Sequence, residues 1–127
     1  MCLAFLHKSI FFRYFLIITI PLTLMFFFRT HAEIAVVVYL TSLTLDILFT
    51  KFVIHKTVYV EKNPAIVFLY KNVSHPIIIY TTLYAAITLI MIFFMGIAEP
   101  MLLIGGIHLT GFVLNIITYL SSFDQKI

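Results

Sequence analysis

The sequence predicts an all-α membrane protein built as a bundle of four transmembrane helices. Hydrophobic residues make up 63% of the 127-residue chain and charged residues only 10%, whereas soluble domains carry about 25% charged residues. Four apolar segments are each long enough to cross a bilayer, which takes ~20 residues in a helix. They are residues 9–28, 34–54, 76–98 and 101–122. Residues 1–127 therefore form a single membrane domain, with no room for a soluble catalytic domain.

The last two apolar segments are separated only by Glu99 and Pro100. A proline disfavours helix at the residue before it and suits the first turn of the helix that follows. We therefore expect these two segments to form a tight antiparallel hairpin.

The basic residues predict the orientation of the bundle. With the N-terminus in the cytoplasm, seven of the eight Lys and Arg residues lie on the cytoplasmic side and only Arg29 lies outside. Cytoplasmic loops carry an excess of Lys and Arg, so both termini are expected in the cytoplasm. The net charge of +3 is spread as single residues at segment ends. This pattern favours contact with membrane lipids and excludes nucleic acid as a partner.

A short apolar stretch at residues 64–71 lies between the second and third segments. Asn63 is a good N-cap and Pro64 a good first residue for a helix there. At ~1.5 Å per residue this helix is too short to span a bilayer. It either lies in the headgroup plane, which we favour, or dips inward as a re-entrant segment shielded by protein.

Asp46 lies inside the second apolar segment and is the most informative residue of the chain. A carboxylate at that depth costs roughly 2.5–3.5 kcal/mol, so it is expected to have a partner or a task. Helical spacing places it on one stripe with other polar residues, and a second stripe runs along the last segment. The stripes, which we expect to face each other, are Tyr39, Ser42, Asp46 and Thr50, and His108, Gly111, Asn115, Thr118 and Ser122.

Counting residues from the outer ends of the segments predicts which polar side chains meet. At ~1.5 Å per residue, Asp46 and Asn115 are nearly level, and His108 lies about one and a half turns further out. We therefore expect an Asp46–Asn115 hydrogen bond, while a direct Asp46–His108 contact requires tilt or a bridging water. The third segment offers further partners in Tyr80, Thr81, Tyr84 and Thr88.

Three roles for Asp46 follow from these observations. It can fix the register of the helices through hydrogen bonds, or it can titrate as a proton- or cation-handling group. It can also ligate a metal together with Glu61 and His108, although no adjacent ligand spacing of the His-x-x-x-His kind supports this. No catalytic constellation is present in the sequence, and no cofactor is required by it.

Two short motifs resemble those of an uncharacterised family of small multi-span membrane proteins of archaea and bacteria. The motifs are Leu45-Asp46-Ile47-Leu48-Phe49-Thr50 and Glu61-Lys62-Asn63-Pro64, and His108 and Asn115 match a His and an Asn in that family's last span. The chain departs from the pattern at Tyr59-Val60, where family members tend to have a glycine before the glutamate.

The resemblance implies a fold of three or four helices in a prokaryotic cell membrane. It also implies a polar cluster of Asp46, Thr50, Glu61, Asn63, His108 and Asn115. For Glu61 and Asn63 to join Asp46, the connector must fold back toward the bundle, as the re-entrant arrangement requires. The resemblance supplies no function.

Three functions are compatible with the sequence. The leading hypothesis is a non-catalytic accessory or scaffold subunit, with other membrane subunits or further copies of this chain as partners, because the loops are short and the apolar faces long. The second is a small transporter or channel component with Asp46 as its proton or cation site. The third is a membrane-embedded metal-dependent enzyme that uses Asp46, Glu61 and His108.

Overall fold

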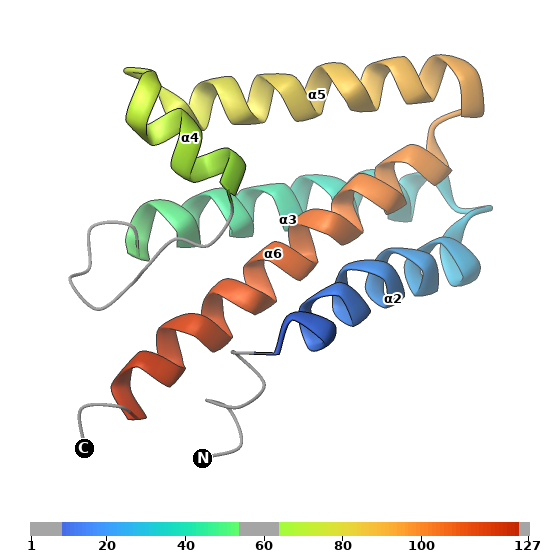
Figure 1. Cartoon of the computed structure of the whole chain (residues 1–127). Helices are drawn as coiled ribbons and strands as arrows, with labels where there is room; N and C mark the ends of the chain where they lie inside the picture. The colour runs from blue at the N-terminus through green and yellow to red at the C-terminus, as the bar shows by residue number, and fades with distance from the viewer. Residues whose placement is uncertain (1–8, 54–63, 125–127) are drawn as a thin grey trace.

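The computed structural model describes residues 9–53 and 64–124, and this part of the chain is an all-α bundle without strands (Figure 1). Its helices in chain order are α2 (Ile10–Phe28), α3 (Ala32–Val53), α4 (Pro64–Asn72), α5 (Pro76–Met95) and α6 (Ala98–Asp124). The predicted fold class, and the four long helices with one short helix between the second and third, are confirmed.

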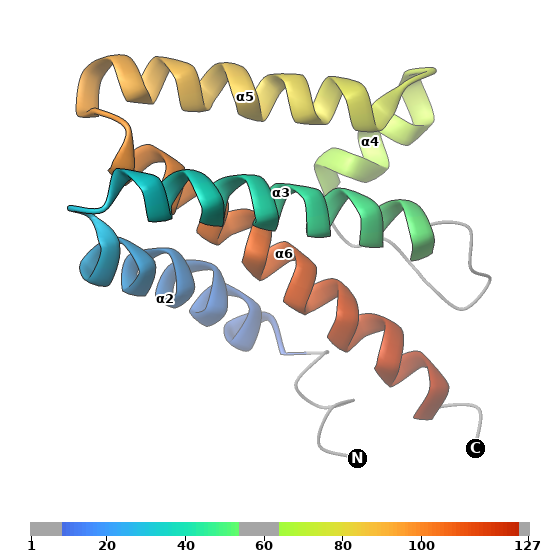
Figure 2. The ribbon, with the colours of Figure 1, turned by 180° about the vertical axis from the view of Figure 1, so that it is seen from behind.

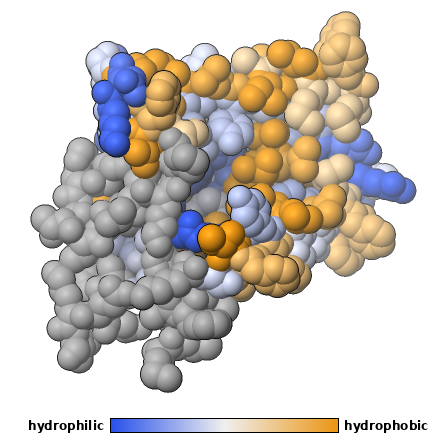
Figure 3. Space-filling view, viewed as in Figure 1, coloured by the Kyte–Doolittle hydropathy of each residue, from blue (hydrophilic) through white to orange (hydrophobic). Residues whose placement is uncertain are grey.

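Four of these helices, α2, α3, α5 and α6, are long and apolar enough to cross a membrane. The nine-residue α4 is not, since it is only about 13 Å long. Figure 3 shows hydrophobic side chains over much of one face and the hydrophilic ones mainly toward its two ends. The chain is therefore a multi-pass membrane protein.

The turn between α5 and α6 differs from the predicted one. It falls at Gly96 and Ile97 rather than at Glu99 and Pro100, and α6 already begins at Ala98. Gly96 has φ 86° and ψ −179°, a conformation open almost only to glycine, and it ends α5. Pro100 lies inside the first turn of α6, where a backbone N–H has no helical partner to lose.

The core of the bundle is the contact of α3 with α6, and α2 packs on the other side of α6. Gly106 permits the close approach of α2, because a Cβ at this position would stand 2.6 Å from the Cα of Pro21. Gly105 does the same toward α3, where a Cβ would stand 3.0 Å from the Cα of Tyr39. Gly105 and Gly106 thus allow both neighbouring helices to approach the backbone of α6 closely.

The α5–α6 hairpin is tight only at its turn. From there α6 diverges diagonally from α5, so that the two helices are far apart at their other ends (Figures 1 and 2). Among the described residues of α5 only Thr88 is buried. This helix covers the bundle without joining its core.

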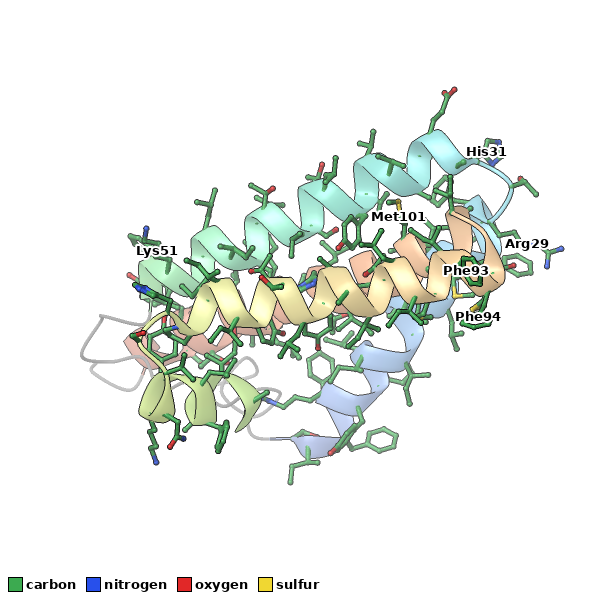
Figure 4. All side chains as sticks on the ribbon, turned by 90° about the horizontal axis from the view of Figure 1, so that it is seen from above. Arg29, His31, Lys51, Phe93, Phe94 and Met101 are labelled. Carbon is green, nitrogen blue, oxygen red and sulfur yellow. The ribbon has the colours of Figure 1, made fainter. Side chains whose placement is uncertain are left out.

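The basic residues that the structure describes lie toward the ends of the helices, in keeping with the predicted orientation. Figure 4 shows Arg29 and His31 at one end of the bundle, beside Phe93 and Phe94, and Lys51 at the opposite end. Arg13 in the first turns of α2 and Lys71 in the last turn of α4 belong to the Lys51 end by chain direction. We refer to this as the α4 end, the one predicted to face the cytoplasm.

Candidate intramembrane polar site

The buried face of α3 is a polar stripe at helical spacing. Its buried residues are Ala35, Tyr39, Ser42, Asp46, Thr50 and Val53. All four members of the predicted stripe are among them, so the prediction that they share one inward face is confirmed. The same spacing leaves Leu40, Leu45 and Leu48 exposed on the opposite face.

The matching stripe of α6 faces α3, and Gly111 lies directly opposite Asp46. A Cβ at position 111 would stand 3.2 Å from Oδ1 and 3.4 Å from Oδ2 of Asp46. The absent side chain therefore provides the space that the carboxylate occupies. His108 and Thr118 are buried on this face, and the side chain of Ser122 lies outside the described part of the chain.

Asp46 and His108 form a buried pair at the centre of the α3–α6 contact. His108 Nδ1 lies 2.9 Å from Asp46 Oδ2, and the two side chains are 0% and 9% exposed respectively. Because a carboxylate only accepts hydrogen bonds, Nδ1 is assigned as the N–H donor. The hydrogen bond from His108 satisfies one oxygen of Asp46, and a buried polar group is tolerated where it has such a partner.

The expected hydrogen bond between Asp46 and Asn115 is therefore wrong. The Asn115 side-chain amide donates instead to Thr50 Oγ1 at 3.2 Å, one turn toward the α4 end. Asp46 is 14 residues after Ala32 and Gly111 is 13 after Ala98, so position 111 is level with the carboxylate and His108 reaches it from the turn before.

The second ring nitrogen of His108 has no hydrogen-bond partner. Nε2 is fully buried, and it is the one buried side-chain polar atom of the described residues left unpaired. The ring is covered from α5 by Tyr84 and Tyr80, with centroids 4.8 and 6.2 Å away in edge-on contacts. An unpaired buried nitrogen costs about 1–3 kcal/mol, so a purely structural histidine would be expected to satisfy it.

Two of the four partners expected from the third segment do not reach the pair. Thr81 and Thr88 donate their hydroxyls back to the carbonyls of Ile77 and Tyr84 within α5. Threonine in a membrane helix commonly satisfies itself in this way. The aromatic residues of that segment, rather than its hydroxyl groups, therefore contact the site.

A small cavity of about 20 Å³ lies beside Asp46, between α3, α4 and α5. This volume is enough for about one water molecule. The cavity is lined by Asp46, Ile47, Thr50, Ile66, Tyr70, Pro76, Ile77 and Tyr80. Ile66 and Tyr70 of the short helix thus lie close to the polar stripe.

The structure describes only the last residue of the motif Glu61-Lys62-Asn63-Pro64. Pro64 begins α4 as predicted, whereas Glu61 and Asn63 lie outside the described residues. The metal hypothesis required Asp46, Glu61 and His108 together, and the structure brings together Asp46 and His108. Within residues 9–53 and 64–124, no group of three His, Cys, Asp or Glu side chains is placed to hold a metal ion.

One polar contact was not predicted from the sequence. Arg13, which was interpreted only as a topology signal, donates from Nη2 to Thr118 Oγ1 at 3.3 Å and thereby joins α2 to the polar stripe of α6. The signal was present, because Arg13 lies inside the helix rather than before it. A long basic side chain there can reach along the bundle toward a polar group.

No family model matches the chain, and no curated protein and no solved structure is significantly similar to it. The site itself therefore carries the functional argument. It is an acid and a base in direct contact, buried in a membrane bundle, with one free ring nitrogen and a cavity the size of one water beside the acid. Such a site can hold a proton and exchange it, but it leaves no room for an organic substrate.

Proposed function

We propose that this chain is a small proton-handling membrane component with Asp46 and His108 as its proton-binding pair. The observation that carries the proposal is the 2.9 Å contact between two titratable side chains inside the bundle, with His108 Nε2 unpaired. Ionisable residues within membrane helices are rare and characteristic of proton relays and ion pathways. The proposal refines the hypothesis of a transporter or channel component that uses Asp46.

The cavity beside Asp46 does not by itself form a path through the membrane. The cavity beside Asp46 holds about one water, so the pathway requires several copies of this chain or a larger complex. Extensive apolar faces on α2 and α5 are available for such association, since both helices leave most of their large side chains exposed. The resemblance to small multi-span proteins of prokaryotic membranes remains a prediction compatible with this role.

The test is proton flux into liposomes that contain the purified chain, followed with an internal pH dye under an imposed potential. Asp46→Asn keeps the shape of the side chain and an oxygen that accepts from His108, but it removes the titrating group. We expect it to reduce flux to the level of protein-free liposomes. Thr44→Val is the matched control, because this hydroxyl is exposed on the opposite face of α3 and bonds only to the Leu40 carbonyl.

Flux that is equal in the wild type and in Asp46→Asn would contradict the proposal. An absence of flux in the wild type would contradict it for the isolated chain and would favour the second candidate. That candidate is a non-catalytic accessory or scaffold subunit of a larger membrane complex. The specific observation in its favour is the small volume of the cavity beside Asp46, which leaves no space for an organic substrate at that site.

Native mass determination distinguishes the two candidates. A gently extracted complex with larger, stoichiometric partner chains supports the accessory subunit. A homo-oligomer with flux that depends on Asp46 supports the proton-handling component.

A further inference from the structure

We infer that the cavity beside Asp46 binds a single water or hydronium ion, and that this site receives it from the α4 end of the bundle only. The inference rests on the proposed proton-handling function and deepens it, because it names the species that reaches the site and the side from which it comes. Three observations support it. They are the lining of the cavity, the enclosure of Asp46 on its other sides, and the position of Asp46 closer to one end of α3 than to the other.

The first observation is the chemistry of the cavity. A buried water needs about 10–15 Å³ and two to four polar partners, and the cavity has about 20 Å³. Most of its wall surface is apolar, and Asp46, Thr50 and two tyrosines are the lining residues that carry polar groups. The Asp46 side chain is 9% exposed.

The second observation is that Asp46 is closed on its other sides. Gly111 lies in contact with the carboxylate, and the fully buried ring of His108 covers it toward the opposite end. Tyr39, two turns further along α3 in that direction, packs against Gly105. Among the described residues, the approach to the carboxylate is therefore between α3, α4 and α5.

The third observation is the depth of Asp46 in its helix. Lys51, a basic residue at the α4 end of the helix, is five residues away, whereas Glu33 in the first turn at the opposite end is 13 residues away. These separations correspond to about 8 Å and about 20 Å along the helix. The shorter distance leads to the end at which Ile66 and Tyr70 of α4 complete the cavity wall.

The short helix α4 therefore has a specific task in this arrangement. It covers the entrance to the cavity from the α4 end without filling it. Ile66 is buried there, while the neighbouring Phe68 is 64% exposed. Among the described residues, Ile66 thus belongs to the cavity wall at the predicted cytoplasmic side.

Cysteine accessibility to silver ions tests the inference without measuring transport. The chain has one natural cysteine, so Cys2→Ser provides the cysteine-free background. Single cysteines are then placed at Ile47 or Ile77, which line the cavity. Their matched controls are Leu48 and Ile78, the adjacent residues, which are 60% and 64% exposed on the lipid-facing side.

The probe is Ag⁺ alone, which is close to water in size, applied to either side of sealed vesicles of known orientation. Silver binds the thiolate, which forms only where water reaches the sulfur. The cysteines that silver did not block are then counted with a fluorescent maleimide after denaturation. We expect Ile47→Cys and Ile77→Cys to react at least about tenfold faster than their controls, and only from the α4 side.

Reaction of Ile47→Cys and Ile77→Cys at the rates of Leu48→Cys and Ile78→Cys would overturn the inference, and so would faster reaction from the opposite side. Should Ile47→Cys fail to fold, Ile77→Cys on α5 carries the same comparison. Silver access from the α4 side without proton flux would retain the water site and contradict the proposed function. Asp46-dependent flux without silver access would support the proposed function and contradict the water site.

Discussion

The α3–α6 contact and the inner face of α5 are both covered by neighbouring helices, but they are built from different side chains. On α3 the buried residues include Ser42, Asp46 and Thr50, whereas on α5 the only buried residue is Thr88. In a bilayer, apolar side chains gain little by leaving lipid for protein, because the lipid is equally apolar. Helices are held together by small residues that allow close approach and by hydrogen bonds, and the α3–α6 contact contains both.

The largest change in stability is expected from removing one partner of the Asp46–His108 pair. His108→Leu leaves the carboxylate buried without its donor, and we expect the free energy of unfolding to fall by about 3–5 kcal/mol. Replacing both residues with leucine removes the unpaired group as well, so the double variant should be close to the wild type in stability or above it. The free energy of unfolding is measured in mixed micelles by adding a denaturing detergent and following the loss of tertiary structure.

A double variant that is less stable than His108→Leu alone would contradict this explanation. It would mean that the polar stripe stabilises the bundle through the pair itself rather than through the avoidance of an unpaired charge.

Gly106→Ala is expected to have the next largest effect. The added Cβ would meet the backbone of Pro21 at 2.6 Å, so α2 must move away from α6. Overpacking of this kind costs about 1–3 kcal/mol. Gly111→Ala is the graded comparison, because its Cβ would meet only the Asp46 side chain at 3.2 Å. If Gly111→Ala destabilised the bundle more than Gly106→Ala in the same micelle assay, close backbone approach of α2 would not limit the packing.

A smaller effect is expected from the second polar contact of the α3–α6 interface. Thr50→Val removes the acceptor of the 3.2 Å hydrogen bond from Asn115. Hydrogen bonds between membrane helices contribute about 0.6 kcal/mol on average. A double-mutant cycle with Asn115→Leu isolates this term, and a coupling energy near that value is expected. A coupling energy of zero would show that the contact does not contribute to stability.

The smallest effect is expected on α5. Leu89 is 67% exposed, so Leu89→Ala replaces one lipid-facing side chain with another. We expect the free energy of unfolding to change by no more than about 0.5 kcal/mol. A loss as large as that of Gly106→Ala would contradict the description of α5 as a cover and would indicate a packed partner surface on its outer face.

Most of the fold could be predicted from the sequence because hydropathy and length determine membrane spans directly. The stripe from Tyr39 to Thr50 could also be predicted, since helical spacing alone places these residues on one face. The start of α6 could not be placed from the proline, because Pro100 tolerates any position in the first turn. Gly96, with its positive φ, was the informative residue there.

Which residues of the site bond to each other was harder to predict than which residues belong to the site. Asp46, Thr50, His108 and Asn115 were all expected in one cluster, and the structure brings these four together. Which of them bond depends on the register of α3 against α6, and the predicted helix starts were two residues late for α3 and three residues late for α6. The clue in the sequence was Gly111, because only a residue without a side chain leaves space for the carboxylate opposite it.

The most direct test of the central claim is the protonation of the His108 ring in the bilayer. Solid-state nitrogen NMR on labelled protein in lipid distinguishes the two ring nitrogens and detects the carboxyl carbon of Asp46 near them. We expect a protonated Nδ1 that correlates with the Asp46 carboxyl, and loss of this correlation in Asp46→Leu. An Nδ1 without a proton, or a ring with no contact to Asp46, would contradict the buried pair and the function proposed from it.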